Sequence, residues 1–148
     1  MFLLSIVTTV CIGVLIGVEF AVSAFVNPIL WQLEPDAQAN AIRRFAGRLG
    51  KTMPPWYVIS LVLLIAEAIT QRHAPGENLL IVASLLWAVV IVFTIVFLVP
   101  INNRMAQLKP QQFTDQTQRA HRKWDALHRL RVVALAVSMV CFLVATRM

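Results

Sequence analysis

The stretch LLIVASLLWAVVIVFTIVFLVPI, residues 79–101, contains no charged side chain. A helix needs about 20 apolar residues to cross the hydrocarbon core of a bilayer, so this stretch predicts a transmembrane helix. Similar apolar runs lie on either side of it, and together they predict four spans at about residues 2–26, 54–71, 78–101 and 124–146. Because lipid offers the backbone no hydrogen-bond partners, all four spans should be helical.

The composition of the whole chain agrees with a membrane protein. Of its 148 residues, 59% are hydrophobic and 14% are charged, and the mean hydropathy is +0.74. Soluble domains average about 45–50% apolar and about 25% charged residues. A water-soluble globular enzyme and a disordered chain are therefore excluded. Four spans and their loops use the whole length, so we expect a single transmembrane domain over residues 1–148.

Lysines and arginines are distributed unevenly between the predicted loops. Nine lie in the segments after spans one and three: Arg43, Arg44, Arg48, Lys51, Arg104, Lys109, Arg119, Arg122 and Lys123. Only Arg72 and Arg147 lie on the other side. Because cytoplasmic loops are enriched in Lys and Arg, we expect the basic segments in the cytoplasm and both termini outside.

The formal charge of +6 is explained by this topology and by contact with anionic lipid headgroups. We therefore expect the lipid bilayer as a partner and no nucleic acid, since no base-reading element is evident. The sequence shows no signal or transit peptide and no cysteine framework, which favours a multi-pass protein of a bacterial inner (plasma) membrane.

The two halves of the chain, residues 1–73 and 76–148, resemble each other. A shift of 75 residues aligns Asn27 with Asn102, Gln32 with Gln107, Pro35 with Pro110, Arg44 with Arg119 and Arg48 with Lys123. The sequence therefore predicts an all-α, up-down-up-down four-helix bundle built from a duplicated two-helix hairpin.

We also expect cytoplasmic helical extensions. Residues Ile42, Phe45, Ala46 and Leu49 recur at helical spacing, which predicts an amphipathic helix at the membrane surface. We expect the Pro54-Pro55 pair to interrupt it before the second span, because proline lacks an N–H group and clashes in a helix interior. In the second half, Thr114 or Asp115 can cap a helix that continues into the fourth span.

Glu19 is the most informative residue of the first span. It lies about 7–8 residues before the cytoplasmic end of the span, hence roughly 10–12 Å deep. A carboxylate at that depth costs several kcal/mol unless it is paired or neutralised, so we expect it to face the bundle interior or water. A purely structural salt bridge stays open beside a functional role.

The fourth span offers partners for Glu19. Trp124, His128 and Arg131 fall at i, i+4 and i+7 on one stripe of a helix. Arg131 is expected at the depth of Glu19, which predicts an ion pair, although snorkelling to the headgroups is the alternative. His128 lies one turn closer to the cytoplasm and titrates near neutrality, which suits proton transfer or ligand binding.

Three asparagines, Asn27, Asn102 and Asn103, mark the cytoplasmic ends of spans one and three, next to prolines. They are candidates for ligand binding, and the alternative is capping of exposed carbonyl groups. In the outer half, Glu67 is close to Arg72 and His73, which predicts an interfacial ion pair. The rest of that half is apolar, so we place the pocket in the cytoplasmic half.

The supply of metal ligands is small. Three histidines are too few for a histidine-box di-iron site, and a carboxylate-bridged di-iron bundle needs about four carboxylates and two histidines. We therefore predict no cofactor. A single metal ion held by Glu19, His128 and Asp125 stays open.

The element VPINNRM, residues 99–105, is followed about twenty residues later by Trp124, His128 and Arg131. With the acidic residue in span one and the Asn27-Pro28 pair at its end, these elements resemble the anthrone oxygenase-like family of small four-span membrane proteins. The resemblance covers nearly the whole chain. It implies oxidation of an activated aromatic CH₂ group of an anthrone to a quinone carbonyl by O₂.

The candidate residues are compatible with that chemistry. His128 or Glu19 could act as the base that forms an anthrone enolate, and Arg131 could stabilise the oxyanion. Trp124 could stack on the aromatic rings. Such an enolate is electron-rich enough to react with O₂ without a cofactor. We therefore expect an oxidoreductase that acts on a lipophilic hydroxyaromatic molecule.

Two other classes of function stay open. In a non-enzymatic binding or assembly module, the polar cluster would only fix the register of the helices. In a small proton-coupled multidrug transporter, Glu19 would exchange protons for lipophilic cations, but such exporters have short loops and little charge bias. The sequence is compatible with a homo-oligomer and does not identify the substrate.

Overall fold

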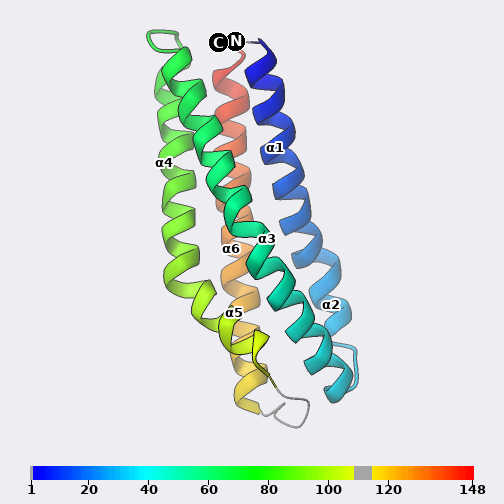
Figure 1. The fold of residues 1–148 in the computed structure, drawn as a ribbon. Helices are drawn as coiled ribbons and strands as arrows, with labels where there is room; N and C mark the ends of the chain where they lie inside the picture. The colour runs from blue at the N-terminus through cyan, green and yellow to red at the C-terminus, as the bar shows by residue number, and fades with distance from the viewer. Residues whose placement is uncertain (1, 109–114) are drawn as a thin grey trace.

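The computed structural model describes residues 2–108 and 115–148, and within these ranges all regular structure is helical (Figure 1). The elements are α1 (Phe2–Ala21), η1 (Val22–Val26), α2 (Asn27–Leu30), α3 (Pro35–Thr70), α4 (Glu77–Phe93), η2 (Thr94–Leu98), α5 (Val99–Ala106) and α6 (Asp115–Ala145). The prediction of an all-α protein is confirmed.

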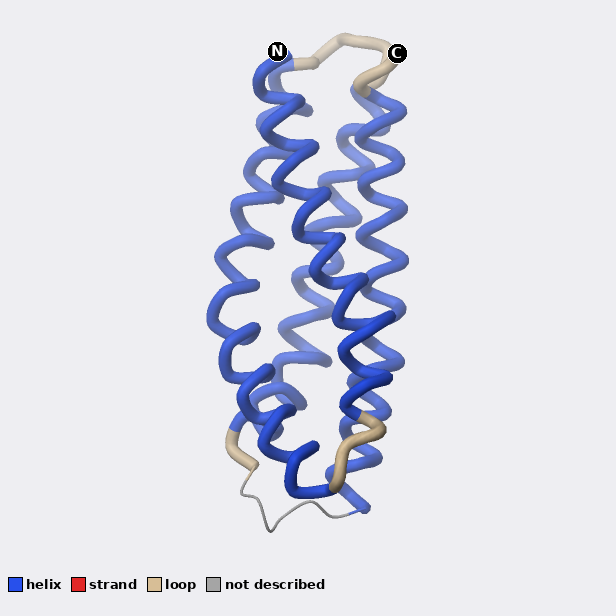
Figure 2. Tube along the Cα trace, turned by 90° about the vertical axis from the view of Figure 1, so that its right-hand side faces the viewer, coloured by secondary structure: helices blue, strands red, loops and turns tan. Residues whose placement is uncertain are grey.

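The elements η1 and η2 are π-helical turns, and each joins the helices on either side of it into one continuous rod. The chain therefore forms four long antiparallel rods. Both chain termini lie at one end of the bundle, which we call the terminal end (Figures 1 and 2). The α1 helix packs against α3 and α6, and α4 packs against the same two helices. This arrangement confirms the up-down-up-down four-helix bundle.

All four rods are long and apolar enough to cross a membrane. They comprise Phe2–Leu30, Pro35–Thr70, Glu77–Ala106 and Asp115–Ala145. Large apolar side chains such as Val89 and Val133, each about 60% exposed, cover the outer surface of the bundle. The rods extend beyond the predicted apolar spans at the end opposite the termini, as expected for helical extensions.

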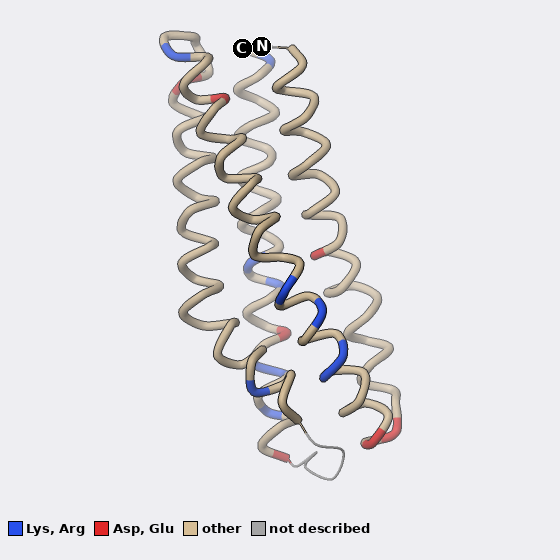
Figure 3. Tube along the Cα trace, in the orientation of Figure 1, with Lys and Arg blue, Asp and Glu red and all other residues tan. Residues whose placement is uncertain are grey.

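Lysines and arginines gather in the half of the bundle farthest from the termini, and we call this end the basic end (Figure 3). Three residues used in the sequence analysis lie outside the described residues: Lys109 of the charge count, Pro110 of the repeat and the predicted cap Thr114. The orientation of the basic end with respect to the membrane stays a prediction.

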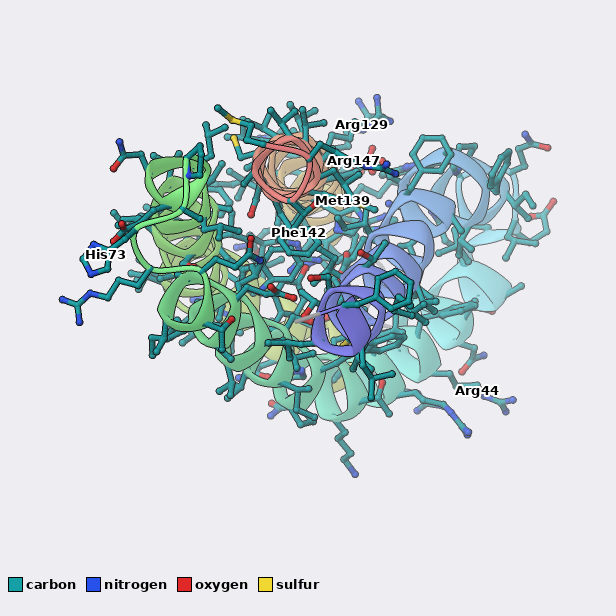
Figure 4. All side chains as sticks on the ribbon, turned by 90° about the horizontal axis from the view of Figure 1, so that it is seen from above. Arg44, His73, Arg129, Met139, Phe142 and Arg147 are labelled. Atoms are coloured by element: carbon teal, nitrogen blue, oxygen red, sulfur yellow. The ribbon has the colours of Figure 1, made fainter. Side chains whose placement is uncertain are left out.

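The apolar core fills the terminal half. Ile12, Leu15, Leu64, Trp87 and Phe142 are fully buried there. In a view along the bundle, Phe142 points into the interior, whereas the surface side chains of Arg44 and His73 project away from it (Figure 4). Most large buried side chains of this half are apolar, and the cavity described below lies in the basic half.

Two prolines account for the two π-helical turns. Each turn ends two residues before a proline, η1 before Pro28 and η2 before Pro100. A proline ring clashes with the carbonyl four residues earlier, and a wider turn moves that carbonyl aside. The two prolines are 72 residues apart, whereas the polar residues of the two halves repeat at 75. The duplication itself stays a prediction.

The expected break at Pro54-Pro55 is wrong, because α3 runs without interruption from Pro35 to Thr70. Both prolines lie on the exposed side of the helix, and neighbouring helices allow prolines inside membrane helices. The amphipathic segment is therefore not a separate surface helix but the first half of α3. Its residues Ile42 and Ala46 are buried against Leu30 and Met105.

Candidate functional site

Glu19 lies inside the bundle, where 3% of its surface is exposed. Its Oε2 accepts a hydrogen bond of 2.6 Å from Nη2 of Arg131, so the expected ion pair is present. Its Oε1 accepts a hydrogen bond of 2.8 Å from the Tyr57 hydroxyl. A buried carboxylate is tolerated when it is paired and hydrogen-bonded, and both conditions are met here.

His128 is 1% exposed and contacts Glu19 through both ring nitrogens. Its Nε2 lies 3.0 Å from the backbone oxygen of Glu19. Because a carbonyl oxygen only accepts, this contact assigns the proton to Nε2. The other nitrogen, Nδ1, lies 2.8 Å from Nη2 of Arg131 and 3.3 Å from Oε2 of Glu19. A neutral His128 therefore accepts from Arg131, and a protonated one can donate to Glu19.

Arg131 does not use all of its N–H groups in hydrogen bonds to the described residues. Its Nη2 contacts Glu19 and His128, and its Nη1 donates a long bond of 3.4 Å to the Thr94 hydroxyl. Within the described part of the chain, its buried Nε has no hydrogen-bond partner. A guanidinium carries five N–H groups, and these contacts use three of them. The group also lies 5.5 Å from the centroid of the Tyr57 ring, at cation–π distance.

Tyr57 is the member of the cluster that the sequence analysis missed. It is 4% exposed, and the indole Nε1 of Trp87 donates to its backbone oxygen over 3.1 Å. One signal was available, because Tyr57 is the only tyrosine in the chain and lies in an apolar run. The supposed helix break at Pro54-Pro55 obscured its depth in the bundle.

Four aromatic rings stack in a row that ends at the cluster. The ring of Trp31 lies 4.6 Å from that of His121, which lies 6.3 Å from Trp124, and Trp124 lies 4.7 Å from His128. The planes of Trp124 and His128 differ by 9°. Protein rings therefore already cover part of the indole surface on which we expected a ligand to stack.

The predicted binding residue Asn27 and the candidate metal ligand Asp125 bind each other. Nδ2 of Asn27 donates to Oδ1 of Asp125 over 2.7 Å, and Nη2 of Arg129 donates to Oδ2 over the same distance. Asp125 is thus engaged away from Glu19 and His128. Within residues 2–108 and 115–148, no three His, Cys, Asp or Glu side chains form a group that could hold a metal ion.

Asn102 joins α5 to α3. Its Nδ2 donates a hydrogen bond of 3.1 Å to the backbone oxygen of Ala46. The helices approach closely here, because a Cβ atom at Gly50 would lie 2.7 Å from the same nitrogen. Glycine at this position makes the contact sterically allowed. The neighbouring Asn103 is exposed at the rim of the cavity described next.

A cavity of about 240 Å³ lies in the basic half, between all four rods. Drug-sized ligands occupy pockets of about 300–1,000 Å³, so the cavity suits a small molecule. Its wall is mostly apolar, with contributions from Val22, Met53, Ile91 and Leu98. All seven predicted site residues line it: Glu19, Asn27, Asn102, Asn103, Trp124, His128 and Arg131. Tyr57 and His121 line it as well.

Glu67 corrects another expectation. It is fully buried near the terminal end and accepts hydrogen bonds from Gln71 at 2.6 Å and from the hydroxyls of Thr8 and Ser5 at 3.3 Å. The predicted ion pair at the interface, with the exposed Arg72, is therefore wrong. The reason is that the α1–α3 seam supplies neutral donors to the carboxyl inside the bundle.

The sequence was compared with protein families, curated proteins and solved structures. A sequence model of a family described as anthrone oxygenase matches residues 43–141, more than half of the chain. No curated protein and no solved structure matches. The matched range includes Tyr57, His128 and Arg131, whereas Glu19 precedes it. The chain belongs to the anthrone oxygenase family.

Proposed function

We propose that the protein is an oxygenase that binds a lipophilic hydroxyaromatic molecule of the anthrone type and oxidises its activated CH₂ group with O₂. The family membership supports the reaction class, and the apolar cavity supports a small, lipophilic substrate. The observation that carries the proposal is the buried Arg131 guanidinium, which lines the cavity with donors to spare beside a carboxylate and a histidine.

The first step is removal of a proton from the CH₂ carbon. His128 takes the proton at Nδ1, whose lone pair accepts from Arg131 until the bound ligand displaces that contact. The resulting imidazolium is stabilised by Glu19, whose carboxylate is 3.3 Å from Nδ1. Arg131 loses its acceptor on His128 with that displacement, so its Nη2 group becomes available to the enolate oxygen. The electron pair of the broken C–H bond is delocalised onto that oxygen.

The second step is the reaction with O₂. The electron pair on the carbon forms a C–O bond, the distal oxygen takes the proton from His128, and a hydroperoxide results. Loss of the remaining proton on that carbon breaks the O–O bond, forms the C=O bond and releases water. In sum, the CH₂ group and O₂ give a carbonyl group and H₂O. The four electrons that reduce O₂ come from the substrate, so the route requires no further reductant.

The test is oxygen uptake by the purified protein in nanodiscs with 9-anthrone as the probe, followed by detection of 9,10-anthraquinone. We expect His128→Ala to abolish the protein-dependent rate. The matched control is Arg129→Ala, one residue away on α6, whose side chain is 63% exposed and should not affect the rate. Equal rates for wild type and His128→Ala would overturn the proposal.

The location in the cell is a separate proposal. We propose a bacterial inner membrane with the basic end in the cytoplasm and both termini outside. The concentration of Lys and Arg in one half of the bundle supports this orientation (Figure 3). The basic side chains would then contact anionic headgroups of the inner leaflet.

A further inference from the structure

A second histidine lines the same cavity outside the cluster around Glu19. His121 is on α6, seven residues before His128, and hence about 10 Å farther along the helix axis toward the basic end. It is 3% exposed. Removal of an imidazole from water into an apolar cavity wall is unfavourable unless its nitrogens find hydrogen-bond partners.

The ring of His121 is held in place by two indoles. Trp31, at the end of α2, stacks on it with 28° between the ring planes, and Trp124 stacks with 25°. Trp31 is itself held by the guanidinium of Arg122, which lies 5.5 Å from its ring centroid. Since the ring faces are occupied by neighbours, the ring nitrogens are the part of His121 that can make directional contacts.

These nitrogens differ from those of His128. Both nitrogens of His128 are bonded to protein atoms, whereas Nδ1 of His121 is buried and has no partner among the described residues. The acid on the next turn, Asp125, does not supply one, because its oxygens bind Asn27 and Arg129. A buried polar atom without a partner costs about 1–3 kcal/mol. A ligand that supplies the partner would recover that free energy.

We propose that His121 is a specificity-determining residue that binds a second polar group of the ligand. The ligand is then an elongated hydroxyaromatic molecule that lies along α6. Its central ring, which carries the reacting CH₂ group and the carbonyl oxygen, is at Arg131, and a hydroxyl group on an outer ring is at His121. This inference rests on the proposed function for the chemical class of the ligand, but it concerns binding and requires no turnover.

The experiment compares two stable quinones that differ only in polar groups on the long axis, 9,10-anthraquinone and 2,6-dihydroxy-9,10-anthraquinone. Equilibrium dialysis against the protein in nanodiscs, with empty nanodiscs as the blank, gives the Kd of each. The variant is His121→Phe, which keeps an aromatic ring between the two indoles. The matched control is His73→Phe, in the exposed turn before α4.

We expect His121→Phe to weaken binding of the dihydroxy compound by about tenfold, the loss of one buried hydrogen bond. Binding of the parent quinone should change less than twofold, and His73→Phe should change neither value. Equal losses for both quinones would mean that His121 only packs, and no loss would mean that it is not in the site. Either result overturns the inference.

Failure of this inference is distinguishable from failure of the proposed function. If wild type binds neither quinone, both the ligand class and the role of His121 are overturned. If His121→Phe weakens binding of the dihydroxy compound alone, but His128→Ala leaves oxygen uptake unchanged, the binding role holds and the oxygenase mechanism fails. If oxygen uptake depends on His128, but His121→Phe affects the binding of both quinones equally or of neither, only the role of His121 fails.

Discussion

The ion pair between Glu19 and Arg131 should couple the two residues strongly in the stability of the bundle. Both side chains are less than one-tenth exposed, and the charged atoms are 2.6 Å apart. Removing one partner of a buried pair leaves an uncompensated charge and typically costs about 3–5 kcal/mol. We therefore expect Glu19→Gln and Arg131→Met each to lower the free energy of unfolding by about that amount.

The double variant should lose far less free energy of unfolding than the sum of the losses in the two single variants. With both changes present neither charge of this pair is left without its partner, so the coupling free energy should be about 2–3 kcal/mol. The assay is a double-mutant cycle in mixed micelles, with unfolding driven by increasing SDS and followed by tryptophan fluorescence. Measurement of all four proteins under identical conditions separates the pair from the general effect of each substitution.

The chain contains a matched control for this cycle on the same helix. Asp125 and Arg129 are 2.7 Å apart, but the arginine is 63% exposed. Asp125 is buried, but water solvates the exposed guanidinium and weakens the attraction, so the cycle made from Asp125→Asn and Arg129→Met should give a coupling free energy below about 1 kcal/mol. If the Glu19–Arg131 cycle were additive, or no larger than this control, the reasoning about a dry, paired charge in the bundle would be refuted.

Three further predictions use other parts of the molecule. Glu67→Gln should change the free energy of unfolding by less than about 1 kcal/mol, because an amide still accepts from the surrounding donors, whereas Glu67→Ala should cost about 1–3 kcal/mol; similar SDS unfolding curves for the two variants would contradict this. Gly50→Ala should destabilise the bundle by about 1–3 kcal/mol, since the new Cβ would lie 2.7 Å from an amide nitrogen on α5. Gly47→Ala, with no atom within 4 Å, should be neutral or stabilising in the same assay. In a cysteine-free background, a membrane-impermeant maleimide should label His73→Cys in spheroplasts and Arg44→Cys only after permeabilisation; the reverse pattern would invert the proposed topology.

The sequence was informative about the fold because the constraint of the bilayer acts on composition. Runs such as residues 79–101 admit only a helix in lipid, and their number determines the bundle. Depth also follows from simple counting, because each residue advances a helix by about 1.5 Å. This is why Glu19 and Arg131 could be paired before their contact was seen at 2.6 Å.

The missing parts of the site depend on tertiary packing. Tyr57 reaches Glu19 only because α3 continues through Pro54 and Pro55, and local propensity predicted a break there. The partners of Glu67 come from α1 as well as from its own helix, so the neighbouring arginine in the sequence was misleading. Side-chain neighbours on other helices cannot be counted along a single chain.

The turn at residues 22–26 determines which side chains share the cavity. Glu19 and Asn27 are eight residues apart, and in an unbroken α-helix they would be about 80° out of line. The π-helical turn between them absorbs one extra residue, so both point into the same cavity. If this segment were regular α-helix at the same length, the hydropathy of the rod would not change, yet Asn27 would turn by about 80° away from Asp125. A one-residue deletion in η1 would leave seven residues and about 20° between Glu19 and Asn27, so it should keep both side chains in the cavity, whereas loss of the π-turn at unchanged length should separate them.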